Sequence, residues 1–138
     1  MTDNGSHIVF ICGSALRGQP DHGNLQRAEF LGEARTVDAY RIHSVKDGWH
    51  PGIYEVNSNG VSIPGELFRL SEDLFDNLVS TEPPDMYPAD ILLEDGRTAT
   101  AMFYPEQLIR ESGWPDISDY GGWISFKNSQ SQAGDSHE

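Results

Sequence analysis

The feature that most constrains this chain is an apolar run, residues 9–12, that stops at a loop bracketed by Gly13 and Gly18. The run has the residue types of a buried strand, and the two glycines permit positive φ angles and a close approach of the backbone to a ligand. Successive backbone N–H groups in such a turn can converge on a carboxylate. An ordinary strand followed by a glycine turn has the same pattern, so the spacing alone leaves both interpretations open.

Length and charge limit the classes of protein to which the chain can belong. Its 138 residues suit one domain with a single core. With 22 acidic and 9 basic residues, the formal net charge is -13. Such a chain repels the phosphate backbone, so we expect no nucleic-acid partner.

The sequence also argues against a membrane or metal protein. No apolar run approaches the roughly 20 residues that span a bilayer, and residues 1–7 lack a basic region followed by a long apolar one. Cys12 is the single cysteine and cannot form an internal disulfide, as is typical of a reducing compartment. We therefore expect a cytoplasmic protein without a membrane partner, a metal site or a cofactor.

The first half of the chain predicts a curled sheet or barrel. Short segments rich in β-branched and aromatic residues are separated by turn signals, and we expect strands at residues 7–12, 30–37, 40–45, 53–56 and 61–70. A short helix is expected at residues 23–29. Pro64 cannot donate to a strand ladder and Gly65 has no side chain, which predicts a bend or bulge there.

The second half adds helices, which makes the predicted fold class α+β. Ser71 can cap a helix that ends before Pro83, since acidic residues occupy its first turn and apolar residues one face. A hairpin follows at residues 89–93 and 98–104, and then a helical turn at 105–110. We expect one domain at residues 7–126, flanked by a flexible N-terminus at 1–6 and a disordered tail at 127–138.

An ordered series of motifs between residues 9 and 126 resembles the γ-glutamylcyclotransferase-like superfamily. Within that group the chain looks closest to the C-terminal domain of allophanate hydrolases. The resemblance implies a mixed α+β fold with a small barrel-like sheet and a pocket at its mouth, and a first glycine loop whose N–H groups bind the substrate's carboxylate. The motifs are residues 13–18, 30–36, 40–42, 51–53, 65–68, 93–96 and 121–123.

The resemblance assigns a catalytic role to Glu82. In the cyclotransferases a glutamate just after the helix acts as general acid/base while the substrate's α-amine attacks its γ-carbonyl, and Tyr87 occupies the place of a tyrosine that follows. A carboxylate with apolar neighbours near a pocket can have a pKa raised toward neutrality, which suits proton transfer at cellular pH. The alternative is a solvated loop glutamate. The implied substrate-binding residues are Cys12, Gly13, Ser14, Ala15, Leu16, Arg17, Gly18 and Tyr87.

Several positions depart from the two family patterns. Cys12 stands where the cyclotransferase loop begins with tyrosine, and Val79 and Thr81 replace the aspartate and tyrosine near the glutamate. Ala15 stands where allophanate hydrolase domains carry a histidine, and its side chain cannot donate a proton or a hydrogen bond. The substrate pocket is therefore expected to differ from both patterns.

Several other reactive residues can be interpreted either as structural or surface residues or as functional ones. Arg17 could clamp a carboxylate, or be solvated or paired with Asp21. Cys12 has no assignable histidine partner, so a buried structural thiol is the better interpretation. Core or surface roles outweigh metal binding for the histidines, and the tryptophans could line a pocket or pack in the core, with Trp123 assigned to packing. These residues are His22, His43 and His50, and Trp49, Trp114 and Trp123.

Two hypotheses for the function follow. The first is a cofactor-free enzyme acting on a small anionic metabolite, a carboxylate-bearing amide or carbamate, with cyclotransferase, lyase or hydrolase-associated activity. The second is a non-catalytic binding or assembly module that contacts an amidase partner or forms a homodimer. Glu82 favours the enzyme, and the departures at Cys12, Ala15, Val79 and Thr81 favour the module.

Overall fold

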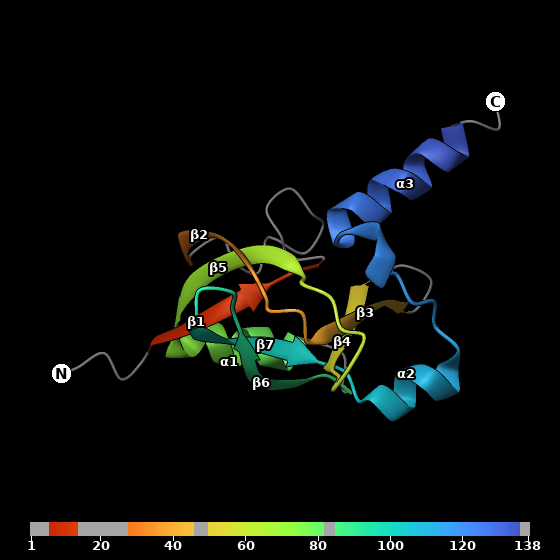
Figure 1. Ribbon diagram of the computed structural model, residues 1–138. Helices are drawn as coiled ribbons and strands as arrows, with labels where there is room; N and C mark the ends of the chain where they lie inside the picture. Colours follow the sequence, from red (N-terminus) through yellow and green to blue (C-terminus); the bar gives the residue numbers. More distant parts are fainter. Residues whose placement is uncertain (1–5, 14–27, 46–49, 82–84, 136–138) are drawn as a thin grey trace.

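A mixed α+β architecture is seen in the computed structural model, which describes residues 6–13, 28–45, 50–81 and 85–135 (Figure 1). A larger five-stranded sheet, a two-stranded sheet and three α-helices form it. The strands are β1 (Ser6–Ile11), β2 (Glu29–Arg35), β3 (Tyr40–Val45), β4 (His50–Glu55), β5 (Pro64–Ser71), β6 (Tyr87–Leu92) and β7 (Thr98–Phe103). The helices are α1 (Glu72–Thr81), α2 (Glu106–Ser112) and α3 (Trp123–Asp135), with a 3-10 turn η2 (Ser118–Tyr120).

Strand β1 lies at the centre of the larger sheet, whose strand order is β2-β5-β1-β7-β6. It pairs antiparallel with β5 and parallel with β7, where Val9 lies opposite Thr100. Val9, Phe10 and Ile11 are buried in the main core because the strand has neighbours on both edges and packing on both faces. The prediction of an interior first strand is confirmed.

The larger sheet curls but does not close. In the described part of the chain its edge strands approach each other through an isolated bridge between Thr36 and Leu93, and the backbone N–H of Glu94 donates to the carbonyl of Arg35 at 2.9 Å. A barrel would need a continuous ladder between β2 and β6. The predicted α+β fold is thus confirmed, with a barrel-like curl and no closed barrel.

The bulge lies in β2 and not at the predicted position in β5. Pro64 and Gly65 pair in regular register with Arg35 and Ala34, whereas the register shifts between Phe30 and Gly32. Proline is tolerated as the first residue of a strand, and Gly32 adopts a φ of 128° that suits a bulge. Of the bend or bulge predicted at Pro64 and Gly65, the bulge is therefore not present.

The smaller sheet, β3 and β4, packs against the larger one. Ile42 and Ile53, which are directly opposite each other, both belong to the main core. The backbone N–H of Tyr104, just after β7, donates to the carbonyl of Ile53 at 3.0 Å, so the end of β7 is fixed to β4. This attachment brings the second sheet to the same end of the molecule as the C-terminal end of β1.

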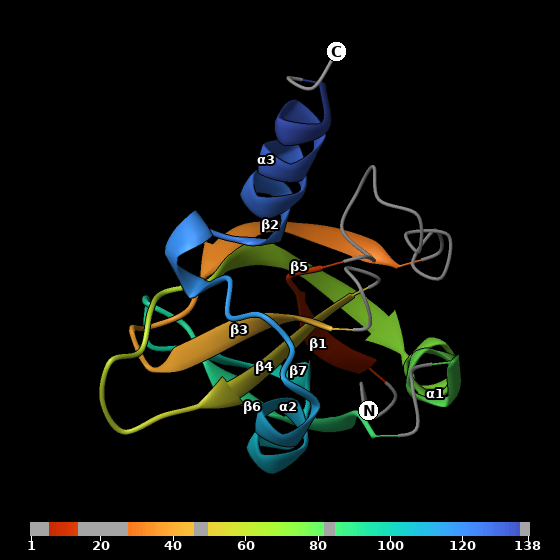
Figure 2. The same cartoon turned by 90° about the vertical axis from the view of Figure 1, so that its right-hand side faces the viewer.

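Helix α1 runs beside β1. The Ser71 hydroxyl accepts a hydrogen bond from the backbone N–H of Leu74 at 3.2 Å, which confirms the predicted cap. Phe75 stacks on His7 with ring centroids 4.0 Å apart, and Leu78 is buried in the main core. In Figure 1 the helix lies along β1, and Figure 2 looks down the helix axis.

The predicted hairpin and second helix are also present. Strands β6 and β7 pair antiparallel across the turn that contains Gly96. Helix α2 begins after Pro105, whose extended backbone suits a helix start, and ends at Gly113 with a φ of 70°. In the helix predicted at residues 23–29, residues 23–27 lie outside the described residues and Glu29 begins β2.

Helix α3 extends away from the two sheets (Figures 1 and 2). Trp123 and Phe126 in its first turn are buried in the main core, which confirms the packing role of Trp123. The predicted disordered tail begins at Lys127, but the structure continues the helix to Asp135. From Lys127 onward the helix sequence is polar or small, a composition that is also typical of disordered segments. Among the described helices, none has the length and apolar character to cross a membrane.

Candidate functional site

The C-terminal end of β1 carries the first predicted site residues, Cys12 and Gly13. Cys12 packs against the main core, and burial raises the pKa of its thiol to about 12. A thiol with that pKa stays protonated near neutral pH, so the preference for a structural role over a nucleophile is supported. The other loop residues, Ser14, Ala15, Leu16, Arg17 and Gly18, lie outside the described residues.

Gly13 is in tight contact with the second sheet. A Cβ atom added at this position would overlap the ring of Pro51 on β4. The neighbouring Gly52 is also enclosed, since a Cβ there would lie 2.8 Å from Val45 Cγ2 and 3.1 Å from Ile109 Cδ1. The start of the loop is therefore held between β1 and β4 at a spacing that only glycine allows.

Strand register places Tyr87 at the same end of the sheet as Cys12. Because Val9 pairs with Thr100 in parallel, Cys12 is level with Phe103, and Phe103 pairs with Tyr87 at the start of β6. Neighbouring strands are about 4.8 Å apart, so Tyr87 lies about 10 Å across the sheet from Cys12. The Tyr87 ring stacks on Phe103 at 6.0 Å and is 43% exposed, which leaves it accessible to a ligand.

The predicted acid, Glu82, lies outside the described residues, and the residues nearest to it that are described are Thr81 and Asp85. Helix α1 begins at the N-terminal end of β1, where Glu72 accepts a hydrogen bond from His7 at 3.2 Å. The chain enters β6 at Tyr87, level with the C-terminal end of β1. The start of α1 and the start of β6 therefore lie at opposite ends of β1.

Two carboxylates extend from the other side of the β1 end. Glu66 on β5 pairs with Ile11, and Glu33 on β2 pairs with Glu66, so the three residues form one row across the sheet. Residues directly opposite on neighbouring strands share a face of the sheet, and like charges in such positions repel. We call Glu33 and Glu66 the acidic pair. Because the two carboxylates repel each other, strand pairing by itself does not favour glutamates at both positions.

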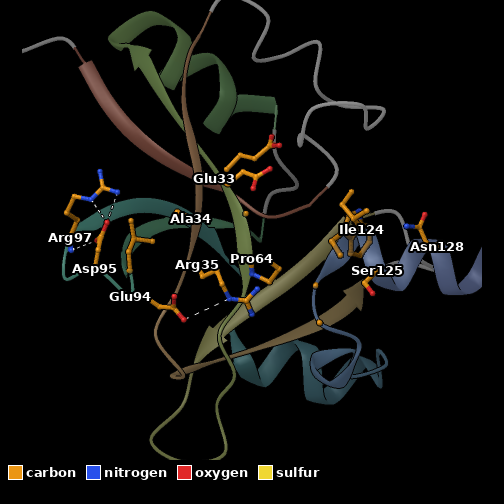
Figure 3. Close-up of a pocket in the computed structure, with 16 residues that line it drawn as sticks. Glu33, Ala34, Arg35, Pro64, Glu94, Asp95, Arg97, Ile124, Ser125 and Asn128 are labelled. Carbon is orange, nitrogen blue, oxygen red and sulfur yellow. Dashed lines mark hydrogen bonds and ion pairs between the residues drawn. The ribbon is translucent and has the colours of Figure 1, made fainter.

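The acidic pair lines an open hollow of about 780 Å³ between the larger sheet and the start of α3. In Figure 3, Glu33 lies on one side of this hollow, and Ile124, Ser125 and Asn128 of α3 lie on the other. The hollow also holds two ion pairs. Arg97 Nη2 lies 2.7 Å from Asp95 Oδ2, and Arg35 Nε lies 4.0 Å from Glu94 Oε2 (Figure 3).

A second group of charged residues lies on β3, β4 and the segment before η2. We call Arg41, His43, Tyr54 and Asp116 the polar cluster; these residues border a polar hollow of about 480 Å³. His43 Nδ1 is 2.9 Å from the Trp114 carbonyl and Nε2 is 3.0 Å from the Tyr54 hydroxyl. A carbonyl can only accept, so Nδ1 carries a proton. Nε2 lies 3.6 Å from Asp116 Oδ2 as well.

Asp116 is the charged centre of the polar cluster. Its Oδ2 accepts from Arg41 Nη2 at 2.8 Å, and its Oδ1 accepts from the Ser118 backbone N–H at 2.8 Å. Partial burial raises the pKa of Asp116, but the hydrogen bonds from Ser118 and Arg41 outweigh burial and lower it below its usual value. His43 is 8% exposed and has a buried structural position, which agrees with the core role expected for it. In the described ranges, no three His, Cys, Asp or Glu side chains are grouped as metal ligands.

Sequence reasoning missed the acidic pair and the polar cluster for different reasons. Glu33 and Glu66 belong to two of the motifs that carried the resemblance, but the pairing of β2 with β5 was needed to bring them together. The polar cluster joins residues that are up to 75 positions apart, such as Arg41 and Asp116, and has no local spacing pattern. The sequence did not decide whether Trp49 and Trp114 line a pocket or pack in the core. Trp114 packs edge-on against Tyr104, and Trp49 lies outside the described residues.

Comparisons with known proteins support the resemblance to γ-glutamylcyclotransferases and to allophanate hydrolase domains. The urea amidolyase of Saccharomyces cerevisiae is 29% identical over 122 residues, which is 84% of this chain and 7% of that enzyme. A protein of Vibrio cholerae named putative gamma-glutamylcyclotransferase is 28% identical over 118 residues, which is 85% of this chain and 95% of that protein. This chain thus corresponds to a small part of the yeast enzyme and to nearly all of the Vibrio protein.

A solved structure has the same fold. The crystal structure of a protein specific to uropathogenic E. coli superposes with a TM-score of 0.83 and is 28% identical, covering 93% of this chain and 98% of the other. The family model of the allophanate hydrolase C-terminal domain matches residues 7–128. The chain therefore belongs to the allophanate hydrolase C-terminal domain family, within the γ-glutamylcyclotransferase-like group.

Proposed function

We propose that this protein is a small-molecule enzyme that acts on a carboxylate-bearing amide or carbamate at the C-terminal end of β1. The observation that carries the proposal is the strand register, which makes Cys12 level with Phe103 and Tyr87. Cys12 and Gly13 begin the predicted glycine loop, and Tyr87 is the first residue of the strand that follows Glu82 in the sequence. The shared level of Cys12 and Tyr87 supports the proposal because each is next in sequence to one predicted part of the catalytic centre.

In this proposal the backbone N–H groups of residues 13–18 hold the substrate's carboxylate, and Arg17 adds a positive charge to the same loop. An anionic group approaching a chain with a net charge of -13 needs such local donors. The contact of Gly13 with Pro51 supports the proposal because it fixes where the loop leaves the sheet. Preorganised donors stabilise a bound anion without the cost of rearrangement.

Glu82 is the proposed proton shuttle. For an amide substrate, the substrate's amine nitrogen attacks the carbonyl carbon, a new C–N bond forms, and the bond to the leaving nitrogen breaks. Glu82 accepts the proton from the attacking nitrogen and returns it to the leaving nitrogen, so protons balance over one turnover. Ala15 cannot supply a proton donor for a carbamate, which favours the amide within this proposal.

The test is the Glu82→Gln variant on a panel of γ-glutamyl and N-carboxyl compounds. Because general acid/base catalysis contributes roughly 100-fold to 10,000-fold, we expect the variant to lose at least about 100-fold in turnover while its thermal unfolding stays unchanged. Asp90→Asn is the matched control, since Asp90 is an exposed carboxylate on β6. Full turnover by Glu82→Gln would contradict the proposed role.

A second candidate function is a non-catalytic module that assembles with an amidase. The observation in its favour is that the domain occurs as a 7% part of yeast urea amidolyase. Two exposed residues where η2 is followed by α3, Tyr120 at 45% and Ile124 at 40%, offer apolar surface for such a contact. Sedimentation of this protein with the amidase part of a urea amidolyase tests it: a stable complex, with no turnover across the panel, supports the module over the enzyme.

A further inference from the structure

A second hydrophobic cluster, distinct from the main core, joins the second sheet to α2, which lies against β4 (Figures 1 and 2). Tyr54 belongs to it through its ring and to the polar cluster through its hydroxyl. We call this group the α2 cluster. Its buried members are Val45, Tyr54, Tyr104 and Ile109, and the residues packed against them are Val56, Met86, Leu108 and Trp114.

Ile109 fixes α2 to the second sheet. It is the buried residue of that helix, and its exposed fraction is 0%. A Cβ atom added at Gly52 would lie 3.1 Å from Ile109 Cδ1 and 3.1 Å from Tyr104 Cδ2. The backbone of β4 at Gly52 therefore packs against the end of the isoleucine side chain. Because protein interiors are close-packed, the position of this backbone depends on the volume of that side chain.

Pro51 connects the α2 cluster to the start of the glycine loop. It is the residue before Gly52 on β4, and its ring lies so close to Gly13 that a Cβ there would overlap it. A proline ring is rigid and its φ angle is fixed, so it cannot move aside without the strand. A change in the position of β4 at Gly52 is therefore transmitted through Pro51 to Gly13.

Met86 connects the same cluster to the start of β6. It packs against the buried members, and Tyr87 follows it as the first residue of the strand. Tyr104 fixes the adjoining end of β7, since its backbone N–H donates to the Ile53 carbonyl at 3.0 Å. Phe103, the residue before it, pairs with Tyr87. The α2 cluster thus contacts both the strand that holds Gly13 and the segment that enters β6.

We propose that Ile109 is a positioning residue, which through the α2 cluster sets the placement of Gly13 relative to Met86. In the sequence, the glycine loop follows Gly13 and Glu82 precedes Met86, so the same contact sets the spacing of the two segments that the proposed function assigns to the catalytic centre. The catalytic part of this inference rests on that proposed function. The mechanical link between Gly13 and Met86 does not.

The first test compares Ile109→Val with Ile91→Val, which removes the same group from the main core. Ile91 is also 0% exposed, and it lies four residues from Tyr87 on β6, about 14 Å along the strand. Both variants keep the hydrophobic pattern and remove one buried methylene, so thermal unfolding should show similar losses of stability. We expect backbone amide NMR shifts at Gly13 and Met86 in Ile109→Val and none at these two positions in Ile91→Val.

The shift at Gly13 is the decisive one. The path from Ile109 to Gly13 runs through Gly52 and Pro51, so a shift there reports transmission along β4, which a residue that only adds stability would not cause. Equal shifts at Gly13 in the two variants, or none in either, would overturn the proposal. This readout needs neither a ligand nor turnover.

A binding measurement then tests whether the placement matters for a ligand. Titration calorimetry with 5-oxoproline as the probe should show affinity reduced by roughly 3-fold or more in Ile109→Val, because a misplacement of about 1 Å can cost about 100-fold. Ile91→Val should bind as the wild type does. Ile109→Leu, which conserves the volume, should retain more affinity than Ile109→Val. Equal affinities of all three variants would contradict the positioning role.

The outcomes separate this inference from the proposed function. Shifts at Gly13 and Met86 in a protein that neither binds 5-oxoproline nor turns over any panel compound support the mechanical link and contradict the enzyme. Turnover that depends on Glu82 and is unchanged in Ile109→Val supports the enzyme and contradicts the positioning role. Turnover that falls in Ile109→Val and not in Ile91→Val, at similar stability, supports both.

Discussion

The end of β1 and the polar cluster on β3 and β4 both gather charged residues, but they use them differently. In the polar cluster, opposite charges and matched donors meet: Arg41 with Asp116, and Tyr54 with His43. At the end of β1 the strand register sets like charges, Glu33 and Glu66, side by side. Matched charges and donors stabilise the fold, whereas like charges directly opposite on neighbouring strands repel each other, so strand pairing by itself does not favour them.

The contact between Gly13 and Pro51 joins the end of β1 to the second sheet. Breaking this contact should have the largest effect on stability and turnover. Gly13 lies against Pro51 of β4, so a valine at position 13 would collide with a ring that belongs to the second sheet. Overpacking typically costs about 1 to 3 kcal/mol, and we expect the Gly13→Val variant to reach the upper part of that range and to lose turnover. Chemical denaturation measures the free energy of unfolding.

Gly96→Ala is the control for this prediction. Gly96 has a φ of 92° but no neighbour within 4 Å of an added Cβ, so only backbone strain of roughly 1 to 2 kcal/mol is expected. Its turnover should be unchanged. A Gly13→Val protein that is as stable and active as the wild type would show that the loop does not depend on the second sheet.

The next largest effect should come from the polar cluster. Tyr54→Phe removes the hydroxyl that is hydrogen-bonded to His43 Nε2 at 3.0 Å and leaves this buried nitrogen without that partner. We expect a loss of about 1.5 kcal/mol in the free energy of unfolding and no change in turnover, because the cluster stabilises the fold. If turnover instead fell while stability was kept, the polar cluster would belong to the functional site, and the contrast between the two regions would fail.

A pH titration sharpens the same contrast. The folded-state pKa of Asp116 is lowered, so its ionised form contributes stability at pH values above its unfolded pKa. That contribution is lost as the pH falls through the folded-state value. Unfolding measured from neutral pH to below about pH 4 should therefore show a smaller acid-induced loss in Asp116→Asn than in the wild type. Parallel curves for the two proteins would mean that Asp116 is not stabilised by Arg41 and Ser118.

Features that depend on residues close together in the sequence could be predicted, and features that depend on residues far apart in the sequence could not. The strand at residues 7–12, the Ser71 cap and the β6–β7 hairpin follow from local patterns, and all are present. The position of the bulge at Gly32 could not be predicted, because it depends on the pairing of β2 with β5. The acidic pair and the polar cluster arise from the same kind of long-range pairing, so no local spacing indicated them.

The central claim, that the glycine loop and Glu82 bind one ligand at the C-terminal end of β1, is tested most directly by a crystal structure of the protein with a bound small carboxylate such as 5-oxoproline. Hydrogen bonds are typically about 2.7 to 3.2 Å long. We expect the ligand's carboxylate at that distance from backbone N–H groups of residues 13–18, and the Glu82 carboxylate within reach of the same ligand directly or through one water. A structure in which Glu82 points into solvent, away from the loop that binds the ligand, would contradict the account.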